Sequence, residues 1–233
     1  MINIGGSIGE LYVGSTEIAK AYVGSQLVYE KASEPLYDSE IAYLQSDGNQ
    51  WVETDILLNM QNKSCTLRTD WYVLSNSTAT FPCGSTGADW ANAYGHFRTG
   101  SNWAGYLRPS YGVMGLSNKA TKANVALAIV QNTTSFSLYQ SGTRVYNSTG
   151  TNARLSNINS TVPLYVFCYN NNGVATNIST MRFIRCYCIT NGGEYLFDIV
   201  PVRKGNVGYI YDRVSGKMWG NAGSGSFILG ADV

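Results

Sequence analysis

Apolar and polar residues alternate along most of this chain, in short runs separated by Gly, Asn, Asp and Ser. The clearest run is 64–74, in which every second residue from Cys65 to Val73 suits a buried face. This period of two is typical of a strand with one face on a core and the other toward solvent. Residues 124–130 are almost continuously apolar, which predicts a central strand. No segment keeps a 3.6-residue period over three turns, so no helix is predicted.

Turn-forming residues divide the rest of the chain into further strands. The other strands predicted after residue 40 are 41–45, 51–57, 79–83, 93–98, 103–107, 111–114, 135–140, 143–147, 164–169, 179–189, 195–200, 208–211, 217–219 and 227–229. In the closing segment, Pro201 and regularly placed glycines separate strands whose aromatic residues are predicted to fill the core: Tyr209, Tyr211, Trp219 and Phe227. The predicted fold is all-β, a two-sheet antiparallel jelly-roll sandwich preceded by a small β-meander.

The first thirty residues contain an internal repeat, because Tyr12-Val13-Gly14-Ser15 recurs as Tyr22-Val23-Gly24-Ser25. With Gly-Ser turns between strand-like runs, residues 10–30 predict a three-stranded meander. Such a sheet is too small to be stable alone. We therefore expect residues 1–31 to serve docking or oligomerisation, the alternative being an extra edge sheet of the main domain. Residues 32–39, with Pro35, are predicted to be a linker, and residues 40–233 the main domain.

Composition narrows the classes of function. Of the 233 residues, 13% are charged and the net charge is +1, so neither nucleic-acid binding nor attraction to an anionic membrane is indicated. No apolar run approaches the ~20 residues of a membrane-spanning helix. The N-terminus lacks the basic and apolar regions of a signal peptide, and five cysteines are an odd number. We therefore expect a protein that is made and kept in the cytosol, with cysteines that pack as small apolar side chains rather than a disulfide framework.

Three segments of the main domain resemble one known family. The opening IAYLQSDGNQWVETD (41–55), the hairpin SFSLYQSGTR (135–144) and the closing DIVPVRKGNVGYIYDRVSGKMWGNAGSGSFILGAD (198–232) are similar to laminin-G-like, or concanavalin A-like, jelly-roll domains of gut bacteria and their phages. In the closing segment Trp219 stands where the family has Phe, and Ala231 where it has Pro. The resemblance implies the jelly-roll fold over nearly all of the main domain.

The segment YVGSTEIAKAYVGSQLVYE (12–30) is similar to segments of phage tail and appendage proteins that precede exchangeable binding domains. This resemblance implies a virion protein, such as a tail appendage, a fibre or a capsid decoration, made in the host cytoplasm and located in the virion. It also implies that residues 1–31 contact other virion proteins, and that the chain is a homo-oligomer, with the trimer usual for phage fibres. The domain would then contact host surface glycans.

The residues offer little for catalysis, so we expect no enzyme activity, no metal and no cofactor. Glu53 and Asp55 share a strand face beside Trp51, but no third acid follows them as in glucanases of this shape. The single histidine, His96, lacks a nucleophile elbow and is expected to be structural or at the surface. The available oxygens for a calcium ion, on Asp47, Asn49 and Asp212, lack the dense spacing of a dedicated site.

A segment rich in aromatic residues, 88–111, has the best chemistry for a ligand. Sugars need a flat apolar surface and planar polar groups, and this segment supplies both. The candidate ligand-binding residues are Trp90, Tyr94, Arg98, Asn102, Trp103, Tyr106 and Tyr111, named here the aromatic platform. The alternative is that these aromatics fill the core of the sandwich. Function therefore stays open between a glycan-binding virion protein, a bacterial carbohydrate-binding module and a purely structural virion protein without ligand.

Overall fold

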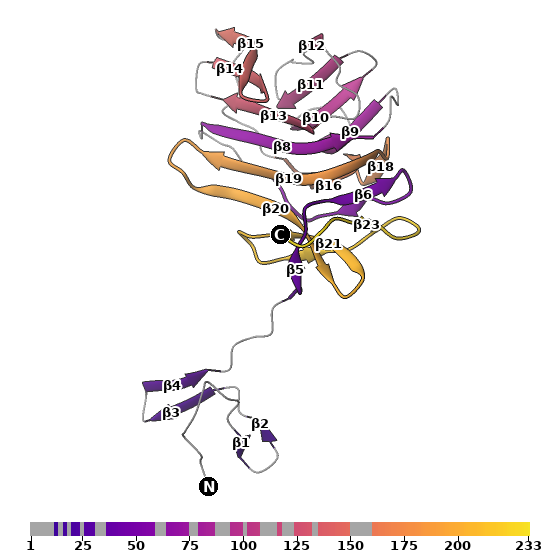
Figure 1. Cartoon of the computed structure of the whole chain (residues 1–233). Coiled ribbons are helices and arrows are strands. Elements are labelled where there is room, and N and C mark those ends of the chain that lie inside the picture. Colours follow the sequence, from indigo (N-terminus) through magenta and orange to yellow (C-terminus); the bar gives the residue numbers. More distant parts are fainter. Residues whose placement is uncertain are drawn as a thin grey trace. The chain divides into compact units, whose positions relative to one another are not determined.

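The structure is a computed structural model that divides the chain into two compact units, Met1–Leu36 and Tyr37–Val233 (Figure 1). It describes residues 12–13, 16–17, 20–23, 26–30, 36–58, 64–74, 79–86, 94–99, 102–107, 116–117, 124–131, 135–149 and 160–233. These residues form strands, turns and loops and no helix. None of the described segments is therefore a helix able to cross a membrane.

The described residues of the first unit form two separate hairpins, whereas the sequence predicted a single three-stranded meander. β1 (Tyr12–Val13) pairs with β2 (Thr16–Glu17), and β3 (Lys20–Val23) pairs with β4 (Gln26–Glu30), both antiparallel. Two residues join the strands of each hairpin, as the repeated Gly-Ser pairs suggest. The difference arises in the middle run, which is divided between β2 and β3, and no ladder among the described residues connects these two strands.

The larger sheet of the second unit contains eleven described strands. Eight of them follow the order β15-β14-β13-β8-β19-β20-β21-β22, while β6 pairs with β19 and β23, and β5 pairs with β20. Their bounds are β5 (Ser39–Glu40), β6 (Leu44–Asp47), β8 (Cys65–Val73), β13 (Asn124–Gln131), β14 (Ser135–Gln140), β15 (Thr143–Thr149), β19 (Thr180–Thr190), β20 (Tyr195–Lys204), β21 (Val207–Asp212), β22 (Met218–Trp219) and β23 (Ile228–Leu229). All of these pairings are antiparallel, as predicted.

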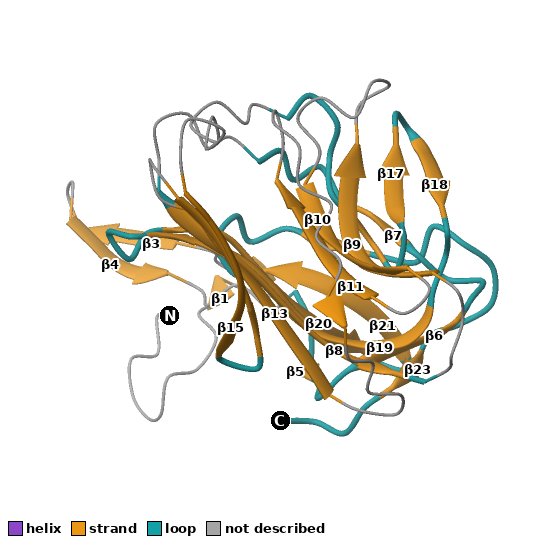
Figure 2. Cartoon of the chain, turned by 90° about the horizontal axis from the view of Figure 1, so that it is seen from above, coloured by secondary structure: helices purple, strands orange, loops and turns teal. Residues whose placement is uncertain are grey.

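The smaller sheet has the order β12-β11-β10-β9-β16-β7. Beside β9 lie β17 and β18 (Figure 2). Its strands are β7 (Val52–Glu53), β9 (Ala79–Thr86), β10 (Tyr94–Thr99), β11 (Asn102–Leu107), β12 (Leu116–Ser117), β16 (Tyr165–Val166), β17 (Tyr169–Asn171) and β18 (Val174–Thr176). One pairing departs from the prediction, because β17 runs parallel to β9. The chain turns at Phe167, which has a φ of 69°, so the strand predicted over 164–169 is split into β16 and β17.

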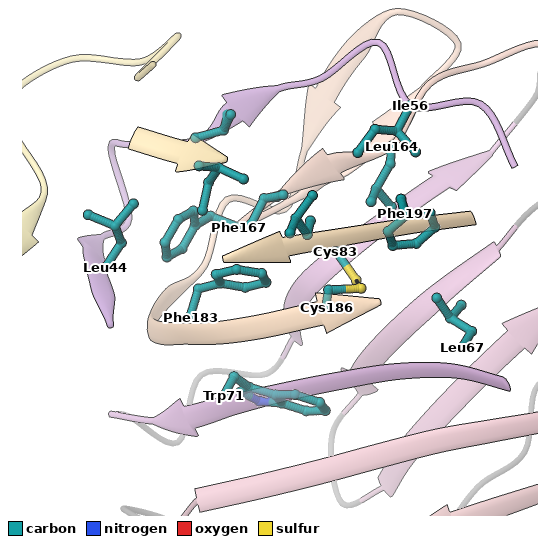
Figure 3. Packing of buried hydrophobic residues seen from close by; sticks show 14 of the residues in the cluster. Leu44, Ile56, Leu67, Trp71, Cys83, Leu164, Phe167, Phe183, Cys186 and Phe197 are labelled. Carbon is teal, nitrogen blue, oxygen red and sulfur yellow. Dashed lines mark hydrogen bonds between the residues drawn. The ribbon is translucent and has the colours of Figure 1, made fainter. Parts of the chain in front are cut away.

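The core lies between the two sheets, as the alternation in the sequence predicts. On β8, Cys65, Leu67, Thr69, Trp71 and Val73 are fully buried, whereas the residues between them are half-buried. From the smaller sheet side come Val52, Cys83 and Val166, also fully buried. Figure 3 shows side chains of both sheets meeting in this layer. All five cysteines are free and buried, as expected of small apolar side chains.

The two ends of the second unit are joined to each other. Ile41 forms a bridge with Asp232, β23 pairs with β6, and Ala42 N–H donates to the carbonyl of Ala231 at 2.8 Å. Arg203 on β20 contacts Asp232 at 2.6 Å and Asp38 at 3.5 Å. The opening and closing segments, which carry the family resemblance, are therefore the segments that close the fold.

The aromatic residues of the closing segment are divided between two faces. Phe227 is buried, as predicted, and Trp219 packs against the core while half-exposed. The prediction was wrong for Tyr209 and Tyr211, which are half-buried on the face opposite Ile210. The period of two assigns the inner positions of β21 to Gly208, Ile210 and Asp212, because these alternate with the tyrosines.

Candidate functional site

The structure places five residues of the aromatic platform on one hairpin, formed by β10 and β11. The register pairs Arg98 with Trp103, Tyr94 with Leu107, Thr99 with Asn102 and Gly95 with Tyr106. Trp90 and Tyr111 lie outside the described residues, as does the predicted strand 111–114. The side chains of the other five platform residues are also outside the described part, so only their register positions are available.

His96 indicates which face of this hairpin is turned toward the core. Its side chain is fully buried between the sheets, in contact with Thr69 of β8. Because residues of a strand alternate between faces, Tyr94, Arg98 and the paired Trp103 share the face of His96, and Asn102 and Tyr106 occupy the other. The hairpin thus brings Arg98 and Trp103 together and separates them from Asn102 and Tyr106. The aromatic platform stays a prediction.

Among the described residues, the outer face of the larger sheet combines aromatic rings with planar polar groups. On β8 and β19, which lie side by side (Figure 1), the half-buried residues alternate with core residues. The register pairs Tyr72 of β8 with Arg182 of β19, and Arg182 with Gln45 of β6. Tyr43, just before β6, contacts the same arginine. We name Tyr43, Gln45, Tyr72 and Arg182 the tyrosine–arginine cluster.

Arg182 lies between the two tyrosine rings of this cluster. Its Cζ is 4.4 Å from the ring centre of Tyr43 and 5.3 Å from that of Tyr72, both within the range of a cation–π interaction. Its Nε donates a hydrogen bond of 2.8 Å to Oε1 of Gln45. These contacts fix the guanidinium plane, while Nη1 and Nη2 contact no carboxylate among the described residues. The cluster therefore fixes the orientation of the guanidinium and leaves its Nη1–Nη2 end without a carboxylate partner among the described residues.

The neighbouring arginines on this face differ from Arg182, because each of them has a carboxylate partner. Arg68 Nε is 2.9 Å from Oδ1 of Asp70, and this hydrogen bond raises the pKa of the guanidinium. Arg185 binds Asp198 through two hydrogen bonds of 2.7 and 2.9 Å. A fork that is already paired with a carboxylate competes poorly for another anion. Of the three arginines, Arg182 is the one suited to a ligand.

The sequence gives little indication of this cluster, because its members come from positions 43–45, 72 and 182. Their proximity depends on the register of β6, β8 and β19, which no local pattern reveals. One local signal was available. In the run Met181–Cys188, Arg182 lies between two core residues, while Arg185 reaches the same outer face only through a register shift after Phe183. This position of Arg182 is the part of the cluster that the sequence alone indicates.

Glu53 and Asp55 lie on one face of β7 and the residues that follow it, as predicted. Both carboxylates are exposed. Val52, Thr54 and Ile56 between them are buried. Glu53 accepts a hydrogen bond of 3.2 Å from Trp51 Nε1, and Asp55 pairs with Lys217. Both carboxylates are therefore engaged by neighbouring side chains at the surface. In the described part of the chain, no group of three or more His, Cys, Asp and Glu residues is arranged to hold a metal ion.

The oxygens considered for calcium stabilise two separate turns. Asp47 Oδ1 accepts hydrogen bonds of 3.0 Å from the backbone and side-chain nitrogens of Asn49. Asp212, which is 2% exposed, accepts from the backbone N–H groups of Asp198, Val214 and Ser215 and from the Ser215 hydroxyl. These carboxylates replace backbone acceptors in turns.

No protein-family model matches the chain, and no curated protein matches it. Solved structures do match. A candidate carbohydrate-binding protein from Bacteroides ovatus superposes with a TM-score of 0.56 at 11% identity, over 84% of this chain and 61% of its own. Domains LG4-5 of the mouse laminin α1 chain superpose with a TM-score of 0.52 at 9% identity, over 97% of this chain and 54% of theirs. The chain has a laminin-G-like jelly-roll fold.

The jelly-roll assignment confirms the fold predicted from the sequence. At 9–11% identity the likeness concerns the fold alone, and this chain spans about three fifths and about half of the two matched chains. A tailspike protein from a bacteriophage of Escherichia coli also aligns, with a TM-score of 0.40 at 12% identity, over 69% of this chain and 27% of its own. A TM-score below 0.5 carries no argument about the jelly roll or its setting.

Proposed function

We propose that the jelly-roll domain binds carbohydrate without enzymatic activity, and that the tyrosine–arginine cluster recognises a sugar bearing a carboxylate. The observation that carries the proposal is the guanidinium of Arg182, held between Tyr43 and Tyr72 with no carboxylate partner among the described residues. Half-buried tyrosine rings offer flat apolar surface for the C–H face of a pyranose, and their hydroxyls can hydrogen-bond its oxygens. The fold likeness to a candidate carbohydrate-binding protein supports the same class of ligand.

An acidic sugar fits this cluster better than a neutral one. The planar guanidinium matches a carboxylate in geometry, and two parallel N–H···O bonds fix its orientation. Gln45 occupies Nε, so the carboxylate would approach the Nη1 and Nη2 end of the fork. The rigid rings on both sides reduce the side-chain entropy lost on binding. The cluster therefore discriminates by charge and ring shape together.

The test measures binding of an oligogalacturonate and of its methyl ester, in which a methyl group on each carboxylate removes the charge, by calorimetry on the full chain. Wild type is expected to prefer the acid. Arg182→Ala should weaken binding of the acid about 10- to 100-fold, because charged hydrogen bonds contribute roughly 1.5–3 kcal/mol. Arg182→Lys should recover only part of the loss, since an ammonium lacks the fork. Arg68→Ala is the matched control, because Arg68 lies on the same face but is already paired with Asp70.

Equal loss in Arg68→Ala and Arg182→Ala would contradict the assignment of the cluster. If neither sugar binds, wild type and the same three variants are tested on a printed array of acidic and neutral glycans. If acidic glycans bind there and Arg182→Ala binds as wild type does, the ligand site is elsewhere. If no glycan binds, the domain is not a carbohydrate-binding module, and the purely structural alternative replaces it.

We further propose that this domain is the adhesin-like part of a phage virion protein that is a homo-oligomer. The sequence similarity of residues 12–30 to phage appendage segments supports this setting. The compact first unit supports it too, because residues 1–31 would then form a separate part that contacts other virion proteins. Light scattering on the full chain should give the mass of a trimer. Peptide mass spectrometry of purified virions should detect the chain, whereas its presence only in bacterial surface fractions would favour a bacterial carbohydrate-binding module.

A further inference from the structure

The core of the jelly roll contains a small polar cluster in which the two sheets contact each other. Thr69 on β8 and Cys186 on β19 belong to the larger sheet, and Cys83 on β9 and His96 on β10 belong to the smaller. All four side chains are fully buried. Thr69 Oγ1 is 2.8 Å from His96 Nδ1 and 3.2 Å from each of the two sulfur atoms. The glycan-binding proposal uses none of these residues.

The two sulfur atoms face each other across the sandwich. Cys83 Sγ lies 3.5 Å from Cys186 Sγ, and Figure 3 shows the two sulfurs side by side between the sheets. A disulfide bond needs about 2.05 Å, so the sulfurs must approach by roughly 1.5 Å. Rotation of two short side chains can supply most of that movement.

We propose that Cys83 and Cys186 form a reversible disulfide that cross-links the two sheets when the protein meets an oxidising medium. The oxidant is a small-molecule disulfide such as oxidised glutathione. The Cys83 thiolate attacks one sulfur of glutathione disulfide, which forms a mixed disulfide and releases one glutathione. Cys186 then attacks the Cys83 sulfur and releases the second glutathione. Two protein thiols are oxidised, one glutathione disulfide is reduced, and the two thiol protons end on the two glutathiones.

The surrounding polar groups favour this pair over an inert apolar contact. A Cys83 thiolate can accept hydrogen bonds from the Cys186 thiol, His96 and Thr69, which lowers the pKa of Cys83. Burial raises the pKa of Cys186. Thr69 Oγ1 lies within hydrogen-bond distance of His96 Nδ1 and of both sulfur atoms, so the hydroxyl connects the four side chains of the cluster.

Burial determines when the reaction occurs. Because both sulfurs are inaccessible in the closed sandwich, exchange with glutathione requires opening of the sheets or takes place while the protein folds. The cross-link would join residues 103 apart in the sequence. Closing so long a loop restricts the unfolded chain, so the oxidised protein should melt roughly 5–15 °C above the reduced one. Such a bond suits a domain that works outside the reducing cytoplasm.

The experiment refolds the full chain with either dithiothreitol or a glutathione redox buffer. After unfolding, alkylation should label five cysteines in the reduced protein and two fewer in the oxidised one. Trypsin leaves Cys83 in the peptide 69–98 and both Cys186 and Cys188 in the peptide 186–203. Cys188→Ala is therefore the matched control: equally buried and two residues away, it should keep the linked peptide pair and the rise in melting temperature.

Cys186→Ala should lose both the linked peptides and the difference in melting temperature. If that variant does not fold, the comparison of reduced and oxidised protein in wild type and Cys188→Ala still shows whether Cys83 and Cys186 are linked. Five labelled cysteines after oxidative refolding would overturn the proposal. So would a linked pair that excludes Cys83, or one that persists in Cys186→Ala.

Discussion

Replacing Gly208 with alanine tests whether β21 closes the core as the structure indicates. A methyl group at this position would lie 2.3 Å from Cδ2 of Leu44 and 2.7 Å from Cδ2 of Leu229. Carbon atoms in contact lie about 3.5–4 Å apart, so the two leucines must retreat by roughly 1 Å. Leu44 is fully buried and has little room to move. Overpacking of this kind costs about 1–3 kcal/mol in the free energy of unfolding.

The assay is urea unfolding followed by tryptophan fluorescence. Gly208→Ala should lower the midpoint without changing the slope. Gly192→Ala is the control, because the nearest heavy atom to its new methyl would be Thr190 Oγ1 at 3.7 Å, and its stability should change by less than about 0.5 kcal/mol. Leu44→Ala alone should cost about 2–5 kcal/mol.

The double variant Gly208→Ala, Leu44→Ala gives the sharper test. The new methyl group would occupy part of the space that Leu44 leaves, so the double variant should be more stable than the sum of the single effects by about 1 kcal/mol or more. Additive effects, or equal stability of Gly208→Ala and Gly192→Ala, would refute the packing of β21 against β6.

Two further predictions concern the aromatic platform and the ion pairs. Trp103 shares the face of the buried His96, so Trp103→Ala should lower the melting temperature; a retained melting curve with weaker binding to glycans or host cells would instead support the aromatic platform. Arg203 donates two hydrogen bonds of 2.6 Å to Asp232 and lowers the pKa of that carboxyl. A depressed pKa contributes stability above the unfolded-state pKa that is lost as the pH falls through the folded-state value. At neutral pH the urea midpoint of wild type should therefore be higher than that of Asp232→Asn. Below about pH 4 the two midpoints should become equal. A difference in midpoint that is constant with pH would count against the ion pair.

Local patterns were sufficient to predict much of the fold. The alternation of β8, the hairpin of β14 and β15 and the long strand β19 were visible as runs bounded by turn residues, whereas the strand predicted over 195–200 ends four residues before β20 does. Where the prediction was wrong, the cause lies outside the run itself. Tyr209 and Tyr211 are large and apolar enough for a core, but Leu44 and Leu229 already occupy the space beside Gly208 and fix which face of β21 points inward.

The candidate site was less accessible from the sequence. The aromatic platform was inferred from residues close together in the chain, and the register separates two of its residues from Arg98 and Trp103. The tyrosine–arginine cluster depends on strands 6, 8 and 19 being neighbours, which only the sheet order supplies. The pairing of Cys83 with Cys186 likewise depends on how one sheet packs on the other, because the two residues are on facing sheets.

The most direct test of the proposed function is a crystal structure of the full chain soaked with an acidic oligosaccharide. We predict that the carboxylate binds Nη1 and Nη2 of Arg182, with a sugar ring against Tyr43 or Tyr72. A sugar bound instead on the β10–β11 hairpin, with the tyrosine–arginine cluster unchanged, would contradict the assignment.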